Sequence, residues 1–82
     1  MGASMELGDK VTVEVGKVIG DMAVFFVRKQ CRDIGIDIAQ LRNQDLPVLA
    51  DRLEKAVSHF TSREVAFGLK RGILEIPSLQ SS

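Results

Sequence analysis

The chain has 82 residues, with eleven basic side chains, eleven acidic side chains and one histidine, so its formal charge at neutral pH is zero. A chain this short forms one domain, and 45% hydrophobic against 27% charged residues argues against intrinsic disorder. Zero net charge removes the long-range attraction to nucleic acid or anionic membranes that strongly basic proteins have. Cys31 is the only cysteine, which excludes an intrachain disulfide and indicates a reducing compartment such as the cytoplasm.

The two ends of the sequence carry no pattern of an ordered element. We expect residues 1–8 to be a disordered segment and residues 77–82 to be a flexible tail. Residues 9–76 are then a single helical domain. The longest apolar run, residues 22–27, is far too short to cross a bilayer, so we expect no membrane association.

Residues 9–34 carry the first strong pattern and predict one long helix. Asp9 is a suitable N-cap. Gly35 followed by Ile36 is typical of the left-handed position that ends a helix. The apolar residues that recur at three- and four-residue spacing are Val11, Val15, Val18, Met22 and Phe25.

An alternative reading places a strand at residues 10–15, where polar and β-favouring apolar residues alternate. Its partner strand would be residues 73–76. Two short strands are marginal by themselves, and they would have to pack on helices or pair across a dimer. This α+β alternative stays open at the level of sequence.

Residues 36–43 form a polar connector, and a second helix is predicted over about 44–60. Asn43 is its expected N-cap, and Asp51 and Lys55 have the spacing of a helical ion pair. Its apolar face consists of Leu46, Leu49, Leu53, Val57 and Phe60.

A third helix follows almost without a loop. Thr61 and Glu64 have the spacing of a capping box, which would start the helix at Ser62. Gly72 either ends it at Arg71 or lets it continue to about residue 76. Its apolar face consists of Val65, Ala66, Leu69 and Ile73. The predicted fold class is therefore all-α, a small three-helix unit with a long first helix.

Residues 22–27 are apolar around the whole circumference of the first helix, and two shorter helices can cover only part of it. We therefore expect a homodimer, unless the terminal segments fold back over this surface. Gly16 and Gly20 would let two helices approach closely, or else they mark a helix start and a packing site under a neighbouring side chain. The predicted self-association surface is Val18, Met22, Phe25 and Phe26.

Two groups of cations raise the alternative of a polyanion partner. Residues 49–71 can be read as a helix-turn-helix of a dimeric DNA-associated regulator, although the corner is short and Glu64 would face the bases. Nucleic acid is therefore not the expected partner. In this alternative, the residues that would contact the polyanion are Arg63, Lys70 and Arg71. A second cluster has a simpler explanation as cations at a helix C-terminus, and it consists of Arg28, Lys29 and Arg32.

Catalysis has little support in the sequence. Cys31 and His59 could form a nucleophile and base, but no motif orients them, and Cys31 suits a small buried position. One cysteine and one histidine are too few for a typical metal site, and no phosphate-binding glycine loop follows a strand. We expect no enzyme, metal or cofactor. The predicted function is a small helical module for oligomerisation or for binding a protein partner.

Overall fold

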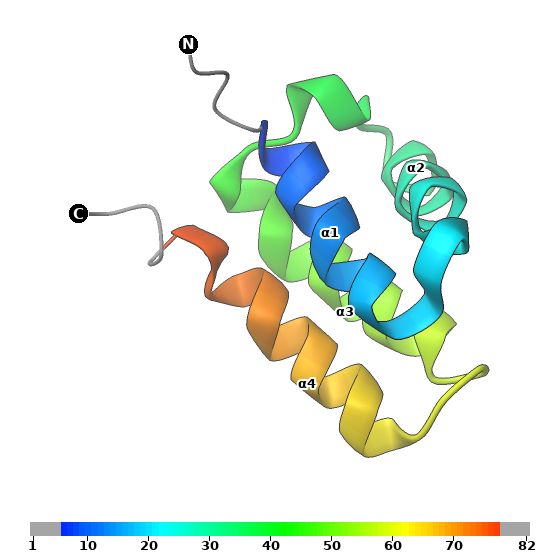
Figure 1. Ribbon diagram of the computed structural model, residues 1–82. Helices are drawn as coiled ribbons and strands as arrows, with labels where there is room; N and C mark the ends of the chain where they lie inside the picture. The colour runs from blue at the N-terminus through cyan, green and yellow to red at the C-terminus, as the bar shows by residue number, and fades with distance from the viewer. Residues whose placement is uncertain (1–5, 78–82) are drawn as a thin grey trace, which may run out of the picture.

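The computed structural model describes residues 6–77, and in this part of the chain the fold is all-α. It contains four α-helices and three short 3-10 turns (Figure 1). The helices are α1 (Leu7–Ile19), α2 (Ala23–Asp33), α3 (Leu46–Val57) and α4 (Arg63–Leu74), and the turns are η1 (Gly20–Met22), η2 (Ile38–Gln40) and η3 (Asn43–Asp45). The all-α prediction is confirmed. The described residues contain no strand, because the stretches 10–15 and 73–76 lie in α1 and at the end of α4.

The expected long first helix is divided at Gly20, so the three-helix expectation becomes four helices. Gly20 has φ 68° and ψ −137°, a backbone conformation open to glycine because it has no Cβ. Its N–H donates to the carbonyl of Gly16, and η1 then redirects the chain into α2. The apolar spacing of residues 11–25 continues across this break, which is why the pattern resembled one helix.

The end of α2 is the one predicted at Gly35. This glycine has φ 80°, and its N–H donates to the carbonyl of Arg32 over 3.0 Å. The N–H of Ile36 donates to the carbonyl of Cys31 over 2.9 Å. These two bonds together form a Schellman motif, so the prediction is confirmed at the level of individual hydrogen bonds.

The N-terminal end differs from the prediction, because the N-cap of α1 is Glu6, three residues before the expected cap Asp9, and the helix begins at Leu7. Gly8 is buried, and a Cβ on it would lie 2.6 Å from Cγ1 of Ile38 in η2. The first turn of α1 therefore packs closely against the connector, and this contact is possible because Gly8 has no Cβ. We expected residues 1–8 to be disordered, and residues 1–5 of that segment lie outside the described part. Residues 78–82 of the expected tail also lie outside it.

The N-caps of α3 and α4 lie two residues and one residue beyond their predicted places, at Asp45 and Ser62. The carboxylate of Asp45 accepts from the backbone N–H of Arg42 at 3.0 Å, so η3 precedes α3 and Pro47 occupies its first turn. Ser62, and not Thr61, caps α4, because its hydroxyl accepts from the N–H of Val65 at 3.2 Å. Only α4 of the two begins where a polar side chain accepts from a free amide, because the N-cap of α3, Asp45, makes no such bond to that helix.

The core lies between all four helices: α4 packs against both α3 and α1, and α2 packs against α1 and α3 from another direction (Figure 1). Every buried residue of the described part is apolar or a glycine. Cys31 is buried among them, which confirms its prediction as a small hydrophobe. The core consists of Val11, Val15, Ala23, Val27, Cys31, Leu41, Leu46, Leu49, Ala50, Leu53, Val57, Ala66, Leu69, Ile73 and Ile76.

Candidate interaction surface

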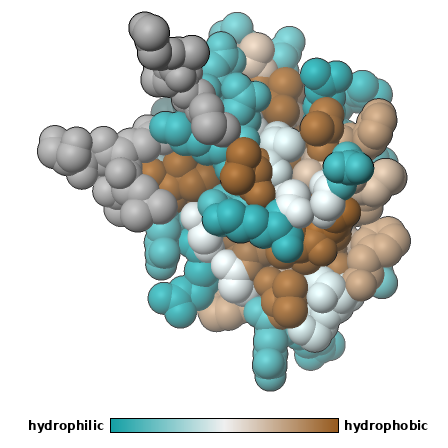
Figure 2. Space-filling model, in the orientation of Figure 1, coloured by the Kyte–Doolittle hydropathy of each residue, from teal (hydrophilic) through white to brown (hydrophobic). Residues whose placement is uncertain are grey.

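The outer face of α2 exposes large apolar side chains. Ala23, Val27 and Cys31 form its buried stripe. On the opposite side, Phe25 is 67% exposed, and Met22 in the preceding turn is 52% exposed. Figure 2 shows hydrophobic side chains at the surface along the edge of the molecule where α2 lies. The apolar run 22–27 thus buries one stripe and leaves another open to solvent, as its all-round pattern indicated.

Phe60 extends this surface onto the corner between α3 and α4. We expected it on the buried face of the second helix, but α3 ends at Val57, and Phe60 is 68% exposed in the following turn. Its ring meets the half-buried ring of Phe26 edge to face, with centroids 5.4 Å apart and planes at 77°. Such T-shaped pairs are favourable because the positive edge of one ring faces the negative face of the other. The α2 patch is defined here as Met22, Phe25, Phe26 and Phe60.

An open groove of about 300 Å³ runs through the α2 patch, between α2 and the end of α3. The polar residues at this groove are Lys29, Gln30 and His59, and the rest of its lining is apolar. The lining consists of Phe25, Phe26, Lys29, Gln30, Ala56, His59 and Phe60. An aromatic centre with a polar rim is the usual anatomy of a protein–protein contact.

The other residues predicted for self-association lie elsewhere. Val18 is half-buried and packs against the core from α1. Gly16 is also in α1, where an added Cβ would lie 3.8 Å from that of Ala23. Gly20 has open space around it and ends α1. Close packing of a second chain at this pair stays a prediction, although the single helix on which it was expected is divided between these two positions.

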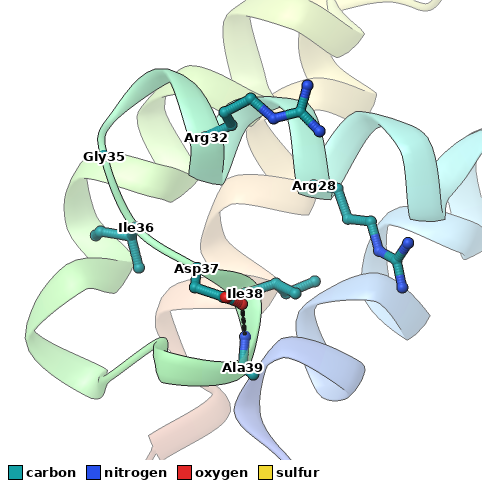
Figure 3. A pocket seen from close by; sticks show the side chains of 7 residues that line it. All are labelled: Arg28, Arg32, Gly35, Ile36, Asp37, Ile38 and Ala39. Atoms are coloured by element: carbon teal, nitrogen blue, oxygen red, sulfur yellow. Dashed lines mark hydrogen bonds between the residues drawn. The ribbon is translucent and has the colours of Figure 1, made fainter.

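Arg28 and Arg32 flank a cleft of about 630 Å³ between α2 and residues 35–39 (Figure 3). Their guanidinium groups end apart and do not converge on one point. On the loop side, the Asp37 carboxylate already accepts from the N–H of Ala39 at 2.9 Å. The third cation of this cluster, Lys29, pairs with Asp33 at 3.1 Å. This cleft has basic edges but no assembled anion site.

The cations proposed to contact a polyanion are largely occupied within the chain. Lys70 is 28% exposed and lies 3.5 Å from Asp51 and 3.6 Å from Glu54, both on α3. Arg71 lies 3.7 Å from Glu75, whereas Arg63 is exposed. In Figure 1, α3 and α4 run side by side in opposite directions, unlike the steep crossing of a helix-turn-helix. The geometry therefore does not favour the DNA-binding alternative.

The same contacts explain the electrostatics of Asp51. Lys55 lies 3.4 Å away, as the helical spacing predicted. Lys55 first, and Lys70 second, hold the pKa of Asp51 below its usual value by favouring the charged carboxylate.

Cys31 and His59 are not brought together as a catalytic pair. His59 is exposed and lines the groove of the α2 patch, whereas Cys31 is buried and is not among the lining residues. Burial chiefly, with the charges of Asp45 and Asp37, raises the pKa of the Cys31 thiol. A thiol held neutral in this way is a poor nucleophile.

Residues 6–77 contain neither a metal-binding cluster nor a membrane-spanning helix. No group of three or more histidine, cysteine, aspartate or glutamate side chains is placed to hold a metal ion there. None of the helices in that range is both long enough and apolar enough to span a membrane.

Comparisons with known proteins add no family to these observations. No protein-family model, curated protein or solved structure matches the chain significantly. A function therefore has to be inferred from the chemistry of the described surface.

Proposed function

We propose that this protein is a small helical interaction module that forms a homodimer through the α2 patch. The observation that supports this proposal is that most of the aromatic residues of the chain lie in the α2 patch. Three of the four phenylalanines of the chain belong to the α2 patch, and Phe25 and Phe60 are each about two-thirds exposed. Leaving such side chains in water is unfavourable, because fully burying one contributes about 1.5–3 kcal/mol.

The exposed apolar residues of the α3–α4 cleft do not form a comparable surface. Val48 and Leu74 share a cleft whose remaining lining is mostly charged, with Asp51, Arg52, Lys55 and Lys70. Single apolar side chains among charges are normal on protein surfaces, whereas a contiguous aromatic group indicates a contact site.

The test is the mass of the protein in solution and its response to one substitution. Sedimentation at micromolar concentration is expected to give a dimer, twice the 9.0 kDa of one chain. Phe25→Ser is expected to give a monomer that retains its helical circular dichroism, because the side chain is exposed in the isolated chain. The matched control is Phe67→Ser on α4, where a 53% exposed phenylalanine lies outside the α2 patch. A wild-type chain that sediments at 9.0 kDa would contradict the proposal.

A further inference from the structure

One side chain in the groove of the α2 patch is of a type that changes its charge near neutral pH. His59, the single histidine of the chain, lines this groove together with Phe25, Phe26 and Phe60. Histidine is the side chain that ordinarily gains its positive charge between about pH 8 and about pH 5. The surface that we propose for pairing therefore contains a side chain suited to respond to mild acid.

The turn that follows α3 sets the position of His59. The helix ends at Val57, and the backbone N–H of His59 donates to the carbonyl of Ala56 over 3.4 Å. The imidazole is exposed, and no hydrogen bond or ion pair joins it to another residue in the range 6–77. In the isolated chain, a proton on this ring is therefore solvated by water.

The charged side chains around the groove are already paired within the chain. From α2, Lys29 lines the groove and pairs with Asp33 at 3.1 Å. From α3, Lys55 precedes His59 by four residues, but it pairs with Asp51 at 3.4 Å and is outside the lining. The described lining thus contains no carboxylate that could pair with a protonated imidazole.

The charges at the start of the next helix do not change this balance. Arg63 and Glu64 are exposed in the first turn of α4 and lie outside the lining of the groove. They carry opposite charges at adjacent positions, so their charges offset each other. Water is therefore the main source of stabilisation for a charged His59, and a partner that displaces this water removes it.

On the basis of the proposed dimer, we infer that protonation of His59 competes with the pairing of two copies. A second copy that covers the α2 patch removes water from the imidazole, and burial disfavours the charged form of the ring. A two-fold contact uses the same surface on both chains, so both copies of His59 enter it. The dimer therefore weakens as the pH falls, because the separated chains bind the proton more readily than the dimer does.

The experiment measures the dimer dissociation constant by sedimentation at about pH 7.5 and at about pH 5.5. The wild-type dimer is expected to weaken at least about tenfold in acid, since two imidazoles respond together. His59→Gln should keep the same dissociation constant within about threefold at both pH values, because an amide does not titrate in this range. Circular dichroism at both pH values checks that each chain is folded.

A fixed positive charge tests the same idea without a change of pH. His59→Lys should weaken the dimer about tenfold at about pH 7.5, because it places two permanent charges in an apolar contact. The matched control is Gln40→Lys, which adds the same charge at an exposed position of η2 outside the groove and should leave the affinity unchanged.

The outcomes separate the two proposals. A wild-type dimer that Phe25→Ser disrupts, but whose affinity is equal at both pH values, would overturn the competition and leave the proposed dimer surface in place. A loss of affinity in acid that persists in His59→Gln would likewise overturn it, as would equal effects of His59→Lys and Gln40→Lys. A wild-type chain that is monomeric at about pH 7.5 would overturn both.

Discussion

The outer faces of α2 and of the α3–α4 hairpin differ in how their side chains are satisfied. On the hairpin, Lys70 of α4 lies between two carboxylates of α3, so charges from one helix are neutralised by the next. On α2, Phe25 is 67% exposed, and Phe60 is 68% exposed although its ring meets that of Phe26 edge to face. The charges between the two hairpin helices are paired within one chain, whereas the α2 face leaves aromatic surface exposed among the described residues.

Under the proposed function, this difference separates residues that stabilise the fold of one chain from residues that form the dimer. A side chain buried within one chain contributes to the stability of the monomer. If the proposed dimer forms through the α2 patch, a side chain exposed there contributes mainly to the stability of the dimer. Substitutions of similar size on the two regions should therefore affect different measurements.

The largest effect is expected in the core of the hairpin. Leu53 of α3 is fully buried, and Leu53→Ala should lower the free energy of unfolding by about 2–5 kcal/mol, because it removes buried methyl groups and leaves a cavity. Phe67→Ala, on the outer side of α4, should change it by only about 0.5 kcal/mol. Urea unfolding of both variants measures the difference. Comparable losses in the two variants would mean that the outer side of α4 is not the exposed surface described here.

A smaller effect is expected at the break between α1 and α2, which sets the direction of the α2 face. Gly20→Ala should destabilise the fold by about 1–3 kcal/mol, since φ 68° with ψ −137° is strained for any residue with a Cβ. An added methyl group meets no atom within 4 Å, so the cost is conformational and not steric. Gly68→Ala is the matched control in α4, where it should stabilise by up to about 1 kcal/mol. If both substitutions stabilised the protein, the positive φ at Gly20 would be contradicted.

Local signals in the sequence predicted the helical stop at Gly35, because a Schellman motif depends only on neighbouring residues. The break at Gly20 was missed because the apolar spacing runs through it, and only tertiary packing decides whether a glycine bends a helix or continues it. Gly72 shows the other outcome, since α4 passes through it and a Cβ there would lie 3.0 Å from a carboxylate oxygen of Glu14.

The candidate surface was predicted in part. The all-round apolar run indicated exposed residues on α2, and Phe25 and Met22 are exposed there. Phe60 was assigned to the core because it continues the spacing of Leu53 and Val57, but α3 ends before it. The pairing of Lys70 with α3 depends on the antiparallel hairpin, which residue spacing does not encode.

The smallest effect is expected in the pH dependence of stability, where the two regions again differ. Lys55 and Lys70 hold the pKa of Asp51 below its value in the unfolded chain. The resulting stabilisation is present above the unfolded pKa and is lost as the pH falls through the folded one. Asp51→Asn should therefore reduce the difference in unfolding free energy between about pH 7 and about pH 3. Asp33→Asn is the control on α2, because Asp33 pairs with one lysine of its own helix and should reduce that difference less. An equal reduction in both variants would show that Lys70, contributed by a second helix, adds nothing to the electrostatic stability of the hairpin.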